Sequence, residues 1–178
     1  MKNYNEALRM DIAVPGGGDP TSIVSGKTDI KVKEGKVYDT SSSQDAFNSL
    51  SAGDTVKLSG FDSSKIQGRN NKIATVTEVE SGGHYFKVDK TLVNVAESDI
   101  PDAGIDVEKS TDEFTVNSDM TKYDYVNDVV ILTTNATSTA DLNKDDFGVT
   151  NDGKVASFTS ALESTDTVLV MWSDGSLG

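Results

Sequence analysis

The sequence of 178 residues contains no cysteine, one histidine, one tryptophan and three prolines. The missing cysteines exclude a disulfide framework, a thiolate nucleophile and a cysteine metal site. No run of about 18 apolar residues is present, which a membrane span would need. The N-terminal stretch MKNYNEALRMDIAV also lacks the apolar centre of a signal peptide. These absences predict a protein that is made in the cytoplasm and has no membrane partner.

The formal net charge is −13, which repels nucleic-acid phosphates and anionic membranes. The sequence therefore predicts no direct nucleic-acid binding. The acidic residues are spread along the chain and are not gathered in a tail. They form either an ordinary solvated surface or a surface that lies near DNA without adhering to it.

Apolar and polar residues alternate along most of the chain, which is typical of β-strands. One short helix is expected at residues 42–50. Short strands separated by turn residues, without alternating helices, predict a mainly β fold of two small β-sandwich or barrel-like domains with an extended N-terminal arm. The clearest strand and hairpin patterns lie at residues 28–40, 54–61, 129–132, 147–158 and 166–172.

Proline and glycine mark the expected boundaries between these parts. PGGGDP at residues 15–20 and the pair Pro101 and Gly104 interrupt the strand patterns. We therefore expect four parts: an N-terminal arm at 1–28, a first β domain at 29–100, a linker at 101–113 and a second β domain at 114–178.

Two stretches of the chain share an outline: FNSLSAGDTVKLSG, which begins at Phe47, and FTSALESTDTVLVMW, which begins at Phe158. Each has an aromatic residue, a small polar run and then Asp-Thr-Val with alternating apolar residues. We expect Phe47 and Phe158 to be buried, each in the core of one domain. The expected core residues are Phe47, Val56, Leu58, Ile73, Val76, Phe86 and Val88 in the first domain and Val130, Leu132, Phe147, Val149, Phe158, Val168 and Val170 in the second. We also expect Asp54 and Asp166 to accept backbone N–H groups where the chain enters a strand.

Motifs of catalysis are incomplete. His84 is the only histidine, and a catalytic triad needs a nucleophile and an acid beside it, so we interpret His84 as a turn or surface residue. SGKT at Ser25–Thr28 lacks the earlier glycine and the following helix of a phosphate-binding loop. The 29 acidic residues allow a carboxylate pair for sugar hydrolysis, but few aromatic residues accompany them. We expect no enzymatic activity, no catalytic residues and no cofactor.

The stretch DLNKDD resembles the start of a calcium-binding loop, with Asp141, Asn143 and Asp145 at alternate positions. The sixth position of such a loop is glycine and the twelfth is glutamate, whereas this chain has Asp146 and Asp152. The sequence therefore favours a solvated turn, and no metal site is expected.

The N-terminal segment is too short to form a core but is more apolar than a solvated tail. Met10, Ile12 and Val14 alternate, so the segment could add as a strand to the sheet edge of a neighbouring copy. The alternative is an unstructured terminus without a partner. The candidate assembly-arm residues are Tyr4, Leu8, Met10, Ile12 and Val14.

Two segments resemble small β modules of tailed-bacteriophage structural proteins: residues 49–93, with a GD-apolar-x-apolar-x-G strand, and residues 141–172. Together they cover about 75 of the 178 residues. The residues that carry the first resemblance are Gly53, Asp54, Val56, Leu58, Gly60, Asn70, Asn71, Ile73, Val76, Val79, Phe86 and Val88.

The resemblance implies a structural component of a tailed phage virion, associated with its tail or neck. Its partners would be copies of itself, as a homo-oligomer, and other virion proteins. A capsid decoration protein is the alternative within this class. A carbohydrate-binding or adhesion module of a bacterial surface protein is the alternative from another class, and such a module would expose a cluster of aromatic side chains.

Overall fold

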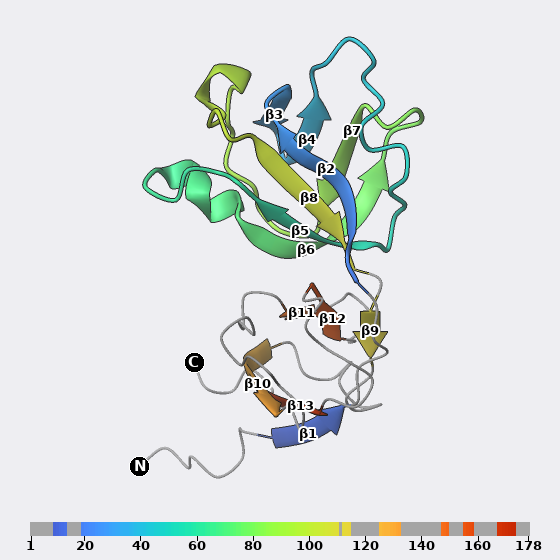
Figure 1. Ribbon diagram of the computed structural model, residues 1–178, viewed down its shortest axis with the longest axis vertical. Coiled ribbons are helices and arrows are strands. Elements are labelled where there is room, and N and C mark those ends of the chain that lie inside the picture. The colour runs from blue at the N-terminus through green and yellow to red at the C-terminus, as the bar shows by residue number, and fades with distance from the viewer. Residues whose placement is uncertain are drawn as a thin grey trace. The chain divides into compact units, whose positions relative to one another are not determined.

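The computed structural model describes the backbone of residues 9–13, 19–110, 112–114, 125–132, 147–149, 155–158 and 167–173, with side chains described for 19–110, 148 and 156–158. The protein is mainly β, as predicted (Figure 1). The chain divides into two compact units, one formed by a continuous stretch and the other by the two stretches that flank it in sequence. We call Pro20–Ser110 the central unit, and Met1–Asp19 with Thr111–Gly178 the terminal unit.

The central unit is built on one antiparallel sheet of seven strands in the order β2-β8-β5-β6-β7-β4-β3. Two short 3-10 helices, η2 (Ile66–Asn70) and η3 (Glu97–Asp99), lie in its loops. The sheet curls around its interior (Figure 1). Its strands are β2 (Thr21–Lys27), β3 (Ile30–Lys33), β4 (Lys36–Asp39), β5 (Thr55–Ser59), β6 (Lys72–Val79), β7 (Tyr85–Val88) and β8 (Ile105–Lys109).

The terminal unit contains two sheets of three strands each among the described residues, in the orders β1-β13-β10 and β11-β12-β9. The hairpin expected at 147–158 is confirmed, because Phe147 pairs with Ser157 and Val149 with Val155. The strands are β1 (Arg9–Ala13), β9 (Asp112–Phe114), β10 (Tyr125–Leu132), β11 (Phe147–Val149), β12 (Val155–Ser157) and β13 (Thr167–Ser173).

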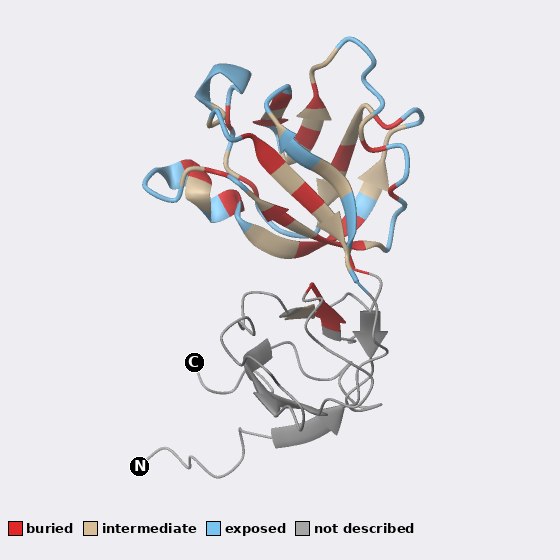
Figure 2. Ribbon diagram, viewed as in Figure 1, coloured by how far each residue is buried: buried red, intermediate tan, exposed pale blue. Residues whose placement is uncertain are grey.

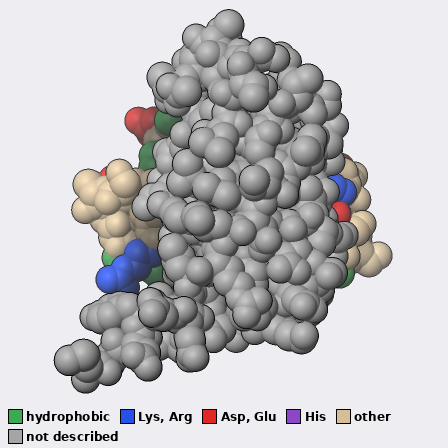
Figure 3. Space-filling model, turned by 90° about the horizontal axis from the view of Figure 1, so that it is seen from below, with side chains coloured by type: hydrophobic (Ala, Val, Ile, Leu, Met, Phe, Trp, Pro, Cys, Tyr) green, Lys and Arg blue, Asp and Glu red, His purple; other side chains and the backbone are tan. Residues whose placement is uncertain are grey.

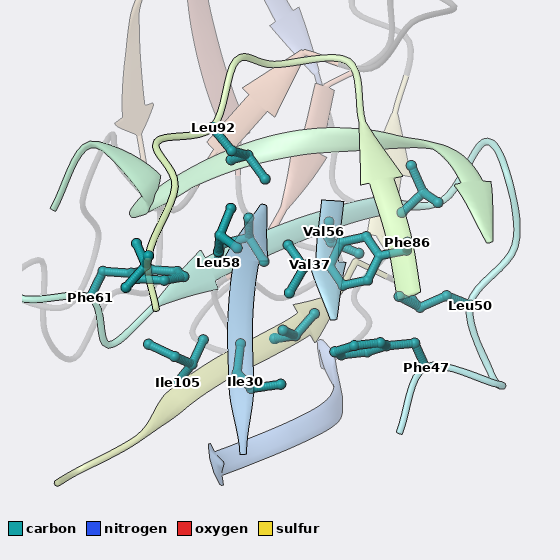
Figure 4. Close-up of a cluster of buried hydrophobic side chains, with 14 residues drawn as sticks. Ile30, Val37, Phe47, Leu50, Val56, Leu58, Phe61, Phe86, Leu92 and Ile105 are labelled. Carbon is teal, nitrogen blue, oxygen red and sulfur yellow. The ribbon is translucent and has the colours of Figure 1, made fainter. Parts of the chain in front are cut away.

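Buried residues alternate with less buried ones along β3, β4 and β8 (Figure 2), as the two-residue period of a strand requires. The inward side chains meet in one interior (Figure 4), where the rings of Phe47 and Phe86 pack edge to face with centroids 4.7 Å apart. The cluster comprises Ile30, Val32, Val37, Phe47, Leu50, Val56, Leu58, Phe61, Val76, Phe86, Leu92, Val95, Ile105 and Val107.

Burial was predicted correctly for both phenylalanines of the shared outline, since Phe47 is 0% and Phe158 5% exposed. Ile73 and Val88 were also expected in the core but are only half-buried. Ile73 pairs with Lys57 and lies on the face of β6 opposite to the buried Ala74 and Val76. Val88 packs against the edge of the core. The other predicted core residues of the terminal unit lie outside the described side chains.

Polar side chains of the phage-like motif hold the loops of the central unit. Asn70 is fully buried; its amide oxygen accepts the backbone N–H of Val93 at 2.7 Å and its amide nitrogen donates to the Val93 carbonyl at 2.8 Å. Asn71 makes the same pair of bonds with the backbone of Phe61. Asp54 accepts the backbone N–H of Ser51 at 2.7 Å, as expected. These motif residues therefore have structural roles.

Two predicted boundaries are wrong. The expected arm at 1–28 contains β2, which pairs with β8 and packs Ile23 and Val24 against the core. Its alternation is obscured by two register shifts. The expected linker at 101–113 contains β8 and β9. β8 lies within the sheet and its Ile105 is fully buried. Pro101 and Gly104 therefore form a turn that leads into this strand and do not mark a linker.

The helix expected at 42–50 is also absent, since residues 46–49 form a turn. The division into two sandwich-like or barrel-like domains with an extended arm stays a prediction.

A candidate interaction face on strands β3, β4 and β7

Strands β3, β4 and β7 lie side by side at one end of the seven-stranded sheet. Their inward positions hold apolar residues and the buried Asp39, whereas their outward positions hold only lysine and tyrosine. Val88, at the end of β7, is half-buried and packs against the core. We call this set the Lys–Tyr face: Lys31, Lys33, Lys36, Tyr38, Tyr85 and Lys87.

The strand register brings equal charges directly opposite each other on this face. Lys36 is the Cα partner of Lys33 on one side and of Lys87 on the other. Like charges directly opposite in a sheet are destabilising. Folding alone therefore gives no reason for this arrangement of lysines.

Aromatic rings occupy the neighbouring positions of the same face. Tyr38 and Tyr85 are Cα partners across β4 and β7, and their ring centroids lie 5.3 Å apart. The ring of His84 meets Tyr38 edge-on with centroids 5.6 Å apart. Two tyrosines that are far apart in sequence thus form one aromatic group.

Lysine ammonium groups cover these rings. The Nζ atom of Lys36 lies 4.1 Å from the ring centroid of Tyr85 and 5.9 Å from that of Tyr38, and the Nζ atom of Lys31 lies 5.0 Å from the Tyr38 centroid. Such cation–π contacts are worth about 0.5–1 kcal/mol at exposed sites, and they offset part of the repulsion between the lysines.

The acidic residues near the face are few. Glu78 of β6 accepts the hydroxyl of Tyr85 at 2.7 Å and pairs with Lys87. Its hydrogen bonds with Lys87 and Tyr85 lower the pKa of the Glu78 carboxyl. Lys33 lies 3.9 Å from Glu34.

No carboxylate of the described residues lies within ion-pair distance of Lys31 or Lys36. Burial lowers the pKa of Lys36, but its contacts with the hydroxyl groups of Tyr38 and Tyr85 raise it more, so the pKa lies above its ordinary value. Lys36 is therefore positively charged at neutral pH. The face presents cationic and aromatic groups that are suited to binding an anionic partner.

Of the candidate arm residues, Met10 and Ile12 lie on β1, where Met10 pairs with Met171 and Ile12 with Leu169 of β13. The alternating segment thus forms a strand, and that strand pairs within its own chain. Tyr4, Leu8 and Val14 lie outside the described residues.

The stretch Ser25–Thr28, which lacks the complete pattern of a phosphate-binding loop, lies on β2 and the residue after it. The backbone N–H of Gly26 donates to the carboxylate of Asp106 at 2.8 Å, and Lys27 Nζ lies 3.2 Å from the buried carboxylate of Asp39. The backbone N–H and the lysine ammonium that a phosphate would need are thus already bonded within the protein.

His84 is half-buried and follows a turn, in agreement with its interpretation as a turn or surface residue. The candidate calcium ligands Asp141, Asn143, Asp145, Asp146 and Asp152 lie outside the described residues.

The Lys–Tyr face was not predicted from the sequence. The signal in the sequence was the period of two at residues 31, 33, 36 and 38, which places two lysines on one side of the first strand of the hairpin and a lysine and a tyrosine on one side of the second. The partners from β7 depend on the pairing of β4 with β7, which the sequence does not show.

Within the described part of the chain, no three or more His, Cys, Asp or Glu side chains gather as a potential metal site. The described residues also include no helix of sufficient length and apolarity to cross a membrane. Comparison with protein-family models, curated proteins and solved structures finds no match to this chain.

Proposed function

We propose that the protein is a non-enzymatic structural subunit of a tailed phage virion, associated with the tail or neck. A capsid decoration subunit is the alternative within this class. The proposal is supported by the resemblance of residues 49–93 and 141–172 to phage β modules and by the mainly β fold. Its partners would be further copies of the chain and other virion proteins.

The observation that carries an assembly role is the position of β1. This strand comes from the N-terminal end of the chain and lies at the edge of the sheet β1-β13-β10. Among the described residues it pairs only with β13, so its other edge has unpaired N–H and C=O groups that another strand can join. An edge strand followed in sequence by PGGG (residues 15–18) is suited to leave its own sheet and pair with β13 of a neighbouring copy.

Cysteine cross-linking tests this strand exchange, because the chain has no cysteine of its own. One chain carries Met10→Cys and a second chain, of different size through a tag, carries Met171→Cys; these positions are Cα partners. Exchange predicts a mixed disulfide between the two chains after assembly and mild oxidation. The matched control replaces Met10→Cys with Arg9→Cys, which is out of register with position 171. Equal cross-linking of both pairs, or none, contradicts exchange.

Particle labelling tests the proposed location. Antibodies against the purified protein should bind the tail or neck of phage particles from the strain that carries the gene, as seen by negative-stain electron microscopy. Labelling over the head surface would support the capsid decoration alternative. Particles that neither bind the antibody nor contain the protein on a gel would contradict a virion role.

A carbohydrate-binding or adhesion module is the second candidate, since Tyr38, Tyr85 and His84 form an aromatic group on the surface of the central unit. Sugars stack on such groups through their apolar C–H faces. Here, however, the ammonium of Lys36 lies over the Tyr85 ring, so a neutral sugar would first have to displace it. This contact favours an anionic partner over a neutral sugar.

A further inference from the structure

We propose that the Lys–Tyr face of one copy docks on the acidic terminal unit of a second copy. The inference rests on the proposed assembly role, but it concerns a different surface from β1 and a different contact.

The first argument is the uneven distribution of charge between the two units. The central unit has 11 Lys and Arg against 14 Asp and Glu, a net charge of −3, whereas the terminal unit has 5 against 15, a net charge of −10. The acidic residues are divided almost equally between the units, so the difference in net charge arises because most of the basic residues lie in the central unit. The described surface shows side chains of both signs (Figure 3).

The second argument is that two of the four lysines of the face, Lys31 and Lys36, have no carboxylate of the described residues within ion-pair distance. Several other lysines of the central unit have carboxylates of their own; for example, Lys65 pairs with Asp62 at 3.4 Å and Lys90 with Asp89 at 3.5 Å. Lys31 and Lys36 instead contact tyrosines, Lys36 through both the rings and the hydroxyl groups of Tyr38 and Tyr85. A carboxylate from outside would relieve the repulsion across β3, β4 and β7.

The third argument is the kind of residue that accompanies the lysines. Tyrosine is enriched among the residues that dominate binding energy at interfaces, and it loses little conformational entropy because it has two side-chain torsions. Tyr85 is further held by its bond to Glu78. The face thus combines rigid aromatic anchors with cations, which suits the surface of another protein.

Among possible anionic partners of the Lys–Tyr face, a second copy of the chain is favoured by its charge and because it is always present. Every copy that presents the face also presents a unit of net charge −10. Because the two surfaces differ, the contact is heterologous: each copy can bind one neighbour through its face and another through its acidic unit, which produces a ring or an open chain. An acidic glycan is the other occupant that the test must distinguish.

Sedimentation of the full chain tests the docking. At an ionic strength of about 0.1 M, where contacts within about 10 Å act while longer-range repulsion is screened, we expect concentration-dependent association that weakens at about 1 M salt. The variant Lys31→Glu/Lys36→Glu should weaken association by about tenfold or more. The matched control Lys65→Glu/Lys90→Glu has the same change in net charge and should change the association constant by less than about threefold. Similar losses in both variants, or no association of the wild type, overturn the proposal.

A mixing experiment tests the heterologous geometry. The Lys31→Glu/Lys36→Glu chain retains its acidic unit, so it should bind to the end of a wild-type assembly without offering a face for the next copy. Adding it to the wild type should therefore reduce the mean assembly size, whereas adding the control variant should not. An unchanged size distribution contradicts docking on the acidic unit.

Polygalacturonate serves as the probe for an acidic glycan. If it binds the wild type through the Lys–Tyr face and the copies do not associate, the occupant is a glycan and the proposal is overturned. Failure of this docking is distinguishable from failure of strand exchange, because charge variants report the first and cysteine cross-linking reports the second.

Discussion

The inward and outward sides of strands β3, β4 and β7 differ in what explains their residues. On the inward side, Ile30, Val37 and Phe86 are fully buried, and the hydrophobic effect accounts for them. On the outward side, a sheet needs only polar residues that do not repel each other, yet Lys36 lies directly between Lys33 and Lys87. Folding thus explains the residues on one side of these strands, whereas the other side carries the docking contact that we propose.

The sharpest test of this comparison uses neighbouring residues on β7. Phe86→Ala should lower the free energy of unfolding by about 3–5 kcal/mol, because it removes a fully buried aromatic ring. Tyr85→Ala, one residue away and outward, should cost about 1 kcal/mol or less. Urea denaturation measures both. Equal losses would show that the outward side also stabilises the fold.

A second test compares a buried with an exposed glycine. A Cβ atom on Gly104 would lie 2.2 Å from the backbone carbon of Gly26, and its φ is +76°. Gly104→Ala should therefore cost about 2–4 kcal/mol through steric overlap and backbone strain. Gly53 has φ +97° but nothing within 4 Å of an added Cβ, so Gly53→Ala should cost only about 1 kcal/mol of strain. Thermal melts that place Gly53→Ala below Gly104→Ala would contradict this.

A third test concerns the one carboxylate on the inward side of these strands. Asp39 is fully buried, and burial raises the pKa of its carboxyl. Hydrogen bonds from Ser41 and Ala46 and the pairing with Lys27 lower this pKa by more than burial raises it, so it lies below the ordinary value of 3.8. The stability that Asp39 supplies is thus present above pH 3.8 and is lost as the pH falls through the lower folded pKa.

Asp39→Asn should cost about 1.5–3 kcal/mol at neutral pH, the usual range for hydrogen bonds to a charged group. It should also flatten the fall of stability below pH 3.8. Unfolding measured at several pH values checks both effects. If the stability of Asp39→Asn falls below pH 3.8 as steeply as that of the wild type, another group controls stability in acid.

The smallest expected effect lies on the outward side. Lys33→Glu replaces a like-charge pair opposite Lys36 with an opposite-charge pair, so it should stabilise the fold by about 0.2–1 kcal/mol. Lys33→Gln, which only removes the repulsion, should have a smaller effect. Both gains should shrink at high salt. Destabilisation by Lys33→Glu would mean that the opposed lysines are not under strain.

Much of the fold could be predicted because local alternation controls it. The hairpin of β3 and β4 and the strand β13 follow from a period of two, whereas the burial of Phe47, which lies in a turn, was expected from the outline that its segment shares with that of Phe158. β2 was missed because its register shifts twice, and β8 because Pro101 and Gly104 precede it. The Lys–Tyr face depends on long-range pairing, since Tyr38 and Tyr85 meet only when β4 pairs with β7.

The register of β2 with β8 has a consequence for the history of the chain. β2 begins at Thr21 and β8 ends at Lys109, and these residues are Cα partners. The two ends of the central unit therefore leave it side by side. A segment with adjacent ends can be inserted into another protein without separating the residues that flank it, and such insertions are well tolerated. The region Pro20–Ser110 has the geometry of a genetic insertion, one unit carried inside another, which a single recombination event could add or remove.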